Sequence, residues 1–212
     1  MSTRPILYDL APSPNNLKVR ITLGYKGIPY EKVPVDGNDR RPVIEVSGQP
    51  FTPVLVHDGR VVFDSGAIIR YLDANWRDTP RIFSTDYQTM REIEDWEWWA
   101  RGELAEPVLS MVRLFFSGKE DEDAIHRANT QFEERCARIE RRLADRPFLM
   151  GDRIDATDLT AAPFAFYGFV TEKAAKAWPV AAFFAKNLRP REEFPLSRAW
   201  VSTLMAYDRM PG

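Results

Sequence analysis

Three consecutive residues early in the chain, Ser13-Pro14-Asn15, carry groups suited to binding an anion. A serine hydroxyl at the start of a helix can accept a hydrogen bond from a backbone N–H and still donate its own hydrogen. The helix N-terminus adds partial positive charge at the same place, and the carboxamide of Asn15 offers a second donor. The pattern predicts either a helix start alone or a helix start that also stabilises a thiolate. Asn15 is correspondingly either a second donor or a surface group of the first turn.

A sulfur atom at such a site must come from another molecule, because the chain has one cysteine, Cys136. A single cysteine excludes an intrachain disulfide and a Cys-x-x-Cys pair. Cys136 recurs with Phe132 and Ile139 at helical spacing, which predicts a small buried apolar side chain. With only His57 and His126 beside it, the sequence has no spacing typical of a zinc site, and we predict no metal.

The charge balance narrows the choice of partners. The 212 residues include 29 Lys and Arg against 31 Asp and Glu, so the formal net charge is -2. Such a balance gives no reason to expect nucleic acid or an anionic membrane as a partner. No apolar run approaches the roughly 20 residues of a membrane helix, and the N-terminus lacks a signal-peptide pattern. We therefore expect a cytoplasmic protein whose partners are small molecules or proteins.

The first 75 residues alternate short apolar runs with turn signals, which predicts a mixed α/β region. The runs at residues 6–8, 30–34, 53–57 and 60–63 are expected to be strands. Asp58-Gly59 separates the last two runs and suits a type I′ turn, so these strands should be antiparallel neighbours. The segment between the second and third strands is expected to be irregular.

A helix is expected after Ser13, although the apolar residues of this segment alternate as they would in a strand. Ser13 is a good N-cap, Pro14 is favoured at the first helical position, and Gly27 falls where a left-handed C-cap belongs. Asn16 is expected to cap the helix or to face solvent. A helix covered on two sides would carry apolar residues around more of its circumference, which would explain the weak helical period.

The chain changes character from about Asp86, where long charged and aromatic stretches predict an all-helical region. A further helix is expected over residues 66–75, and the polar, proline-containing residues 76–81 are interpreted as a linker. We therefore expect two domains, residues 1–76 and residues 86–212.

Four motifs follow one another along the chain. They are the turn "SPNNLKVRI", the segment "FTPVLV", the signature "FDSGAIIRYL" and the helix start "MGDRIDATDLTAAP", which has Asp155 and Asp158 at the positions of a capping box. In this order they resemble the motifs of the cytosolic glutathione S-transferases. The Ser-Pro-Asn turn is similar to that of the Nu-class members and their bacterial relatives. The resemblance implies a thioredoxin-like N-terminal domain followed by a helical-bundle C-terminal domain, the glutathione S-transferase fold.

The same resemblance implies glutathione as co-substrate and assigns residues to each of its parts. It places Ser13 and Asn15 at the sulfur, Thr52 and a cis Pro53 at the cysteinyl group, Asp64 and Ser65 at the γ-glutamyl group, and Gln49, Arg41 or Arg40 at the glycine carboxylate. For two of these assignments a purely structural role stays open. Pro53 can be an ordinary strand entry, and Asp64-Ser65 can be only a helix cap.

The aromatic residues after Asp86 are expected mainly in a core or a dimer interface, and the resemblance implies a homodimer. Met111 and Phe115 are the candidates for a hydrophobic co-substrate site at the domain cleft. The expected function is attack of the glutathione thiolate on an electrophilic small molecule. The alternatives are a Nu-like disulfide reductase, which Asn15 favours, and a non-catalytic binding module with the same fold.

Overall fold

The computed structural model of the chain describes residues 4–190 and 193–209, and these divide into two compact units. One unit comprises the described residues up to Ser84 together with those after Leu204. The other runs from Thr85 to Leu204. Each unit is described here by itself.

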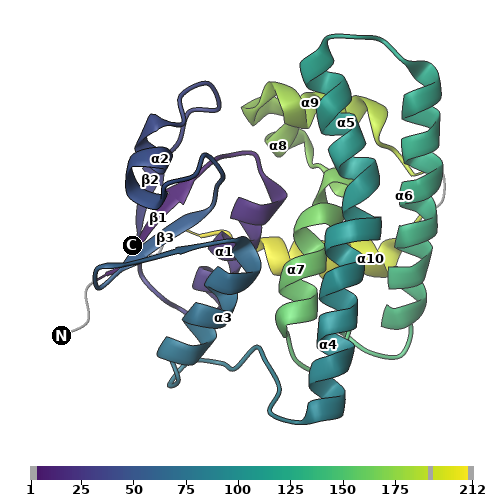
Figure 1. Ribbon diagram of the computed structural model, residues 1–212. Coiled ribbons are helices and arrows are strands. Elements are labelled where there is room, and N and C mark those ends of the chain that lie inside the picture. Colours follow the sequence, from purple (N-terminus) through teal and green to yellow (C-terminus); the bar gives the residue numbers. More distant parts are fainter. Residues whose placement is uncertain (1–3, 191–192, 210–212) are drawn as a thin grey trace. The chain divides into compact units, whose positions relative to one another are not determined.

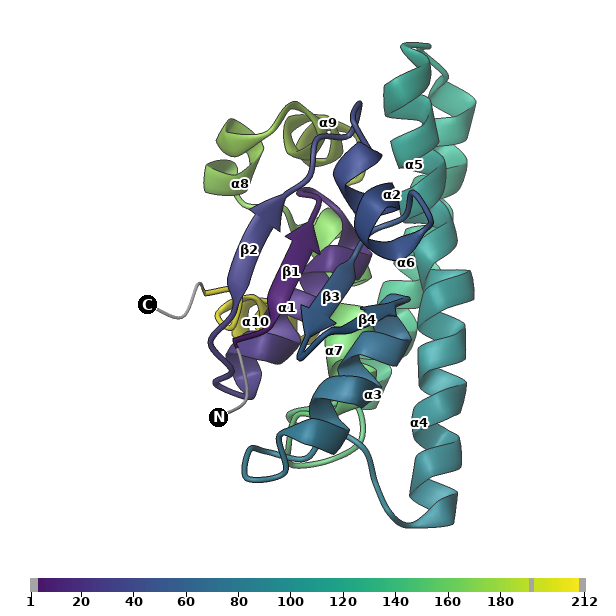
Figure 2. The same cartoon turned by 60° about the vertical axis from the view of Figure 1, so that its left-hand side comes forward.

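The first unit is built on a four-stranded sheet whose strands all match the runs predicted from the sequence. The strands are β1 (Ile6–Asp9), β2 (Glu31–Pro34), β3 (Val54–His57) and β4 (Arg60–Phe63). Their order is β2-β1-β3-β4, with β1 and β2 parallel and the other neighbours antiparallel (Figure 2). Asp58 and Gly59 both have positive φ, at 48° and 74°, as a type I′ turn requires. The predicted hairpin and the thioredoxin-like sheet are confirmed.

The two faces of the sheet bury different residues because side chains alternate along a strand. Leu7 and Leu55 are direct partners across β1 and β3, and both are fully buried. Their neighbours Tyr8 and Val54 form the next pair and belong to an apolar cluster with Val43. Figure 1 shows α1 (Pro14–Tyr25) and α3 (Ser65–Asn75) on one side of this sheet and α2 (Arg41–Ser47) on the other.

Helix α1 begins where the sequence predicted, with Ser13 as N-cap and Pro14 in the first turn. Eight consecutive positions, 16–23, are buried, including charged ones. The guanidinium of Arg20 pairs with Asp9 at 2.8 Å, and the ammonium of the C-cap residue Lys26 pairs with Asp73 at 2.9 Å. A helix covered on nearly all sides has no polar stripe, which explains why its periodicity resembled that of a strand.

The expectation of an irregular segment between β2 and β3 is wrong, because α2 lies there. Pro42 stands in its first turn, and Gly48 ends it in a left-handed conformation with φ 73°. The N–H of Gly48 donates to the carbonyl oxygen of Ile44 at 2.8 Å. Val43 is the buried residue of this short helix, so the sequence shows little helical periodicity.

The second unit is helical, as predicted. Its elements are α4 (Tyr87–Trp99), a π-helical turn (Ala100–Leu104), α5 (Ala105–Ser117), α6 (Glu122–Leu143), α7 (Ala156–Ala165), a 3₁₀ turn (Phe166–Phe169), α8 (Glu172–Ala177), α9 (Pro179–Asn187) and α10 (Pro195–Met205). Figure 1 shows α4, the π turn and α5 as one continuous rod, with α6 returning beside it. Among the described residues, no helix combines the length and apolar character needed to span a membrane.

The residues after α10 belong to the first unit, although the sequence-based boundary placed them with the helices. Asp208 binds Arg20 of α1 through two bonds, of 2.8 and 3.1 Å. The backbone of Tyr207 also packs against Gly24, where an added Cβ would lie 1.9 Å from the Tyr207 carbonyl oxygen. The late segment of the chain therefore packs on α1, where the guanidinium of Arg20 binds the carboxylates of both Asp9 and Asp208.

Candidate functional site

Ser13 lies at the N-terminus of α1 with extended backbone angles, φ −146° and ψ 128°. Its Oγ accepts from the N–H of Asn16 at 3.5 Å, the long limit of a hydrogen bond. The side chain is half-buried rather than enclosed. The cap uses only the oxygen of the hydroxyl, so its hydrogen can be donated to a ligand at the positive end of the helix.

Asn15 contacts the start of a second helix. Its Oδ1 accepts from the Oγ of Ser65, the first residue of α3, at 3.3 Å. This contact engages the carbonyl side of the amide and directs the NH₂ side away from Ser65. The N-terminal ends of α1 and α3 are thereby brought together, and both contribute partial positive charge.

Asn16 has a different place from the one expected. It is fully buried, its Oδ1 accepts from the N–H of Leu10 at 3.0 Å, and its Nδ2 donates to the Oγ1 of Thr52 at 3.0 Å. The expectation that it caps the helix with its side chain or faces solvent is wrong. Its partners lie 6 and 36 residues away, so no local sequence signal could have found this bridge between β1, α1 and the loop before β3.

The loop before β3 carries the predicted proline. The Thr52–Pro53 peptide bond is cis, Pro53 is buried, and Thr52 is half-buried. A second cis bond, Ala11–Pro12, immediately precedes Ser13 and was not expected from the sequence. The candidate site therefore lies between two turns that each contain a cis proline.

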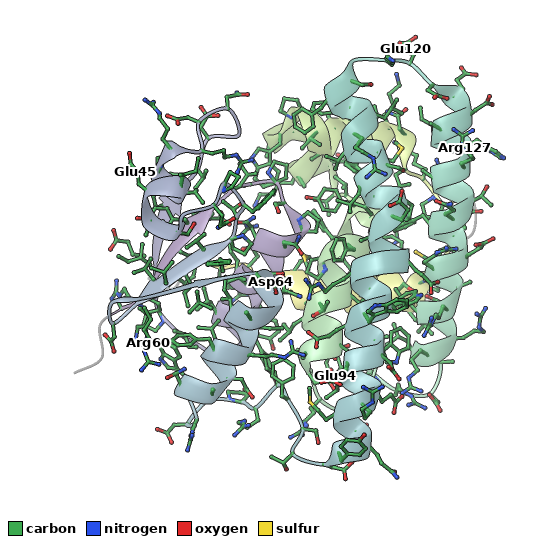
Figure 3. The ribbon with its side chains drawn as sticks, in the orientation of Figure 1. Glu45, Arg60, Asp64, Glu94, Glu120 and Arg127 are labelled. Carbon is green, nitrogen blue, oxygen red and sulfur yellow. The ribbon has the colours of Figure 1, made fainter. Side chains whose placement is uncertain are left out.

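Asp64 and Ser65 form the start of α3, where Figure 3 labels Asp64. The Oδ1 of Asp64 accepts from the N–H groups of Gly66 and Ala67 at 2.8 and 3.1 Å. Asp64 is exposed and has φ 69°, a left-handed conformation that is uncommon for residues other than glycine. The carboxylate of Asp64 therefore caps α3.

The candidates for a carboxylate of the ligand have local partners. The side-chain amide of Gln49 binds within its own loop. Its Nε2 donates to Ser47 and to the carbonyl oxygen of Phe51, and its Oε1 accepts from the N–H of Phe51. Arg41 is exposed and pairs with Asp39 at 2.7 Å. The contacts of Arg41 and Gln49 are therefore local to the α2 region, and their assignment to a glycine carboxylate stays a prediction.

The candidates for a co-substrate site, Met111 and Phe115, lie on α5 in the helical unit. Met111 is buried, and the ring of Phe115 lies 5.4 Å from that of Phe183. Phe183 lines an open groove of about 640 Å³ between the start of α6 and α9. Of the other aromatic residues, Trp96 and Trp99 are buried, whereas Trp98 and Phe116 are 75% and 77% exposed.

Cys136 and the potential metal ligands are the remaining groups that could do chemistry. Cys136 is fully buried, as predicted, and burial raises the pKa of its thiol. The described residues contain no cluster of His, Cys, Asp and Glu that could hold a metal ion. What the first unit offers instead is a set of hydrogen-bond donors at two helix N-termini, which suits an anionic ligand.

Two family models match the chain. Residues 7–80 match the N-terminal domain of glutathione S-transferases, and residues 103–208 match their C-terminal domain. Among curated proteins, the chain is 27% identical over 178 residues to glutathione S-transferase U22 of Arabidopsis thaliana, covering 82% of this chain and 78% of that protein. It is 27% identical over 200 residues to glutathione transferase GST 23 of Zea mays, covering 92% and 82%.

Solved structures agree in fold. A theta-class glutathione S-transferase from Xanthomonas axonopodis pv. citri, determined with glutathione bound, has a TM-score of 0.75 and 23% identity, covering 99% of this chain and 97% of that one. A Tau-class glutathione S-transferase from mango has a TM-score of 0.74 and 22% identity, covering 96% and 89%. At these identities the structures establish the fold.

Proposed function

The chain belongs to the cytosolic glutathione S-transferase superfamily, and on this premise we propose that it is a glutathione transferase whose Ser13 stabilises the thiolate. Glutathione is the co-substrate and supplies the sulfur that Cys136, buried on α6, cannot supply. The observation that carries the assignment of Ser13 is its position as N-cap of α1 with a hydroxyl hydrogen available to a ligand.

The chemistry required of Ser13 is modest. A free thiol has a pKa of about 8.5, and lowering it by two pH units requires about 2.7 kcal/mol of preference for the thiolate. One hydrogen bond to a charged acceptor, together with the helix N-terminus, has about this size. The thiol proton leaves to solvent. The thiolate then forms a carbon–sulfur bond with an electrophilic small molecule, whose leaving group departs with the bonding electron pair.

Asn15 is the second donor of this site in our proposal. Because Ser65 occupies its carbonyl oxygen, the amide presents N–H rather than C=O to the ligand. A carbonyl in that place would repel a thiolate. Ser65 therefore supports the sulfur site through Asn15, in addition to its own proposed contact with the γ-glutamyl group.

The rest of glutathione is assigned along the first unit. The backbone of Thr52, beside the cis Pro53, pairs with the cysteinyl group. The exposed carboxylate of Asp64 and the N–H groups at the start of α3 bind the amino and carboxylate ends of the γ-glutamyl group. Arg41 and Gln49 are the proposed partners of the glycine carboxylate, after release from their local contacts.

Three further features complete the proposal. Met111 and Phe115 contribute to the electrophile site in the helical unit. The exposed Trp98 and Phe116 support a homodimer, because large exposed aromatic side chains are typical of an unoccupied interface. The proposed location is the cytoplasm, the compartment of the superfamily.

Retention on immobilised glutathione, with elution by free glutathione, is the first test of this function. Conjugation of glutathione to an aryl halide should then be measured beside glutathione–disulfide exchange. We expect conjugation to dominate, since the relatives named above are transferases. The absence of both retention and conjugation would indicate a non-catalytic module. Exchange without conjugation would indicate a disulfide reductase.

A further inference from the structure

A single buried residue, Asn16, contacts two hydroxyl groups of the candidate site. Its backbone N–H donates to the Oγ of Ser13 at 3.5 Å, and its side-chain Nδ2 donates to the Oγ1 of Thr52 at 3.0 Å. Its remaining side-chain atom, Oδ1, accepts from Leu10 at 3.0 Å. Both polar atoms of the Asn16 side chain are therefore hydrogen-bonded, which fixes the orientation of its amide.

The direction of these bonds determines what the two hydroxyl groups can do. A hydroxyl has one hydrogen to donate and lone pairs to accept. Both the Ser13 and Thr52 oxygens are acceptors toward Asn16, so the hydrogen of each must point elsewhere. Within residues 4–190 and 193–209, neither hydroxyl donates to a protein acceptor. Accepting a hydrogen bond also polarises a hydroxyl and strengthens the bond that it donates.

We propose that the Thr52 hydroxyl is a second O–H donor to the glutathione sulfur, and that Asn16 positions the hydroxyl groups of both Ser13 and Thr52 for this purpose. The inference rests on the proposed function, which places the Thr52 backbone at the cysteinyl group and Ser13 at its sulfur. The side chain of Thr52 is then beside the sulfur as well. The amide of Asn15, held by Ser65, is the third donor around the same atom.

This assignment gives Thr52 a chemical role beyond its backbone. A valine has nearly the same shape and would support the cis-proline turn equally well, but it could neither accept from Asn16 nor donate to a thiolate. A serine keeps both abilities. The pair Thr52→Val and Thr52→Ser therefore separates the hydroxyl from the shape of the side chain.

The test is the pKa of the bound glutathione thiol, read on the full chain from the ultraviolet absorbance of the thiolate against pH. We expect Thr52→Val to raise this pKa by about half to one pH unit, and Thr52→Ser to leave it near that of the parent. Ser13→Ala, measured beside them, should raise it by about one to two. Glutathione affinity and thermal unfolding of each variant show that it is folded and binds.

The role of Asn16 is tested by Asn16→Asp, which keeps the acceptor for Leu10. A carboxylate oxygen at the place of Nδ2 would accept from the Thr52 hydroxyl and turn its hydrogen away from the sulfur. The added negative charge also raises the thiol pKa, so the same change is made in the Thr52→Val background. Asn16→Asp should raise the thiol pKa more in the parent than in the Thr52→Val background, because only the parent has a Thr52 hydroxyl whose hydrogen can be turned away from the sulfur.

The outcomes separate this inference from the proposed function. A rise in Ser13→Ala with none in Thr52→Val would overturn the inference and leave the proposed function intact. Equal rises in Thr52→Val and Thr52→Ser would likewise overturn it, because the effect would then follow side-chain shape. No change in Ser13→Ala, or no binding of glutathione by the parent, would instead refute the proposed site. If Asn16→Asp does not fold, the two Thr52 variants decide the question.

Discussion

Two helix starts in this molecule have a polar cap, but the two caps differ in how many of their hydrogen-bonding groups are engaged. At the start of α1, the Ser13 hydroxyl makes one long hydrogen bond and is half-buried. At the start of α7, Asp155 and Asp158 form a reciprocal capping box inside the protein. Asp158 alone accepts from Leu149, Asp155 and Trp200 at 2.9, 3.1 and 2.8 Å.

The difference teaches how to distinguish a structural cap from a cap with a second role. The carboxylate oxygens of the α7 box are engaged in hydrogen bonds that join α7 to a preceding loop and to α10. The box therefore stabilises the fold and offers few acceptor positions to a ligand. The α1 cap leaves a hydrogen unused beside a helix N-terminus. Sequence shows the cap in both places, but only the contacts show which one is saturated.

The largest effect is expected at the saturated cap. Asp158→Ala would leave three buried N–H donors without an acceptor, at about 1–3 kcal/mol each, so the free energy of unfolding should fall by at least about 3 kcal/mol. Asp121→Ala is the matched control, because Asp121 caps α6 at the surface with one bond to Ala124. That change should cost about 1 kcal/mol. Chemical denaturation measures both, and equal losses would contradict the distinction drawn here.

The second effect is a pH dependence of stability. Burial, with the neighbouring carboxyl of Asp155, raises the pKa of Asp158 to about 7. In the unfolded chain the pKa of an aspartate is near 3.9, so Asp158 binds its proton more tightly in the folded state. The stabilisation that this proton gives to the folded state is complete below about pH 4. The free energy of unfolding should therefore fall as pH rises from about 4 to 7, by an amount on the order of 3 kcal/mol.

Asp158→Asn is the control for this titration, because an amide cannot ionise. The pH profile of this variant should be flatter than that of the parent between these limits. A parent profile that is flat or rises with pH would mean that the three N–H donors keep Asp158 ionised throughout.

A third cap, Asp64, lies between the two extremes because it caps α3 and is exposed. Asp64→Ala should weaken glutathione binding by roughly 1.5–3 kcal/mol, since it removes a charged partner of the γ-glutamyl amine. Loss of the cap should lower stability by about 1 kcal/mol. Calorimetric titration and thermal unfolding are to be compared. Lower stability with unchanged affinity would reduce Asp64 to a cap.

The smallest of these effects concerns the open cap itself. Ser13→Ala should lower stability by about 1 kcal/mol and raise the pKa of the bound thiol by about one to two pH units, at about 1.4 kcal/mol per unit. Ser13→Asp keeps a good cap but places a negative charge against the sulfur, so it should abolish thiolate formation in a folded protein. If both variants titrate like the parent, Ser13 is a helix start alone.

Much of the fold could be predicted from local signals. The Asp58-Gly59 turn located the hairpin of β3 and β4, and Ser13-Pro14 located the start of α1 against a misleading alternation of apolar residues. That alternation misleads because α1 is covered on nearly all sides, and the charged groups of Arg20 and of the C-cap residue Lys26 are buried in ion pairs with Asp9 and Asp73. A helical period in the sequence reflects the contrast between a buried apolar face and an exposed polar face, and in α1 this contrast is small.

The parts that could not be predicted depend on long-range contacts or on short elements. Helix α2 buries Val43, too little for a periodic signal. The bridge from Asn16 to Thr52 spans 36 residues and exists only after the sheet has formed. Ser13 and Asn15 were proposed as candidates because they adjoin a helix start, whereas Asn16, which contacts both Ser13 and Thr52, was expected to cap the helix or to face solvent.

The ion pairs of Arg20 have a consequence for the order in which the protein is made. Arg20 pairs with Asp9 in its own neighbourhood but also with Asp208, which is 188 residues later in the chain. A ribosome adds residues from the N-terminus, so the sheet unit emerges before the carboxylate that accepts from Nε and Nη2 of this guanidinium. Its last partner is translated after every helix of the other unit. The unit that begins synthesis is thus the one whose interior is completed last.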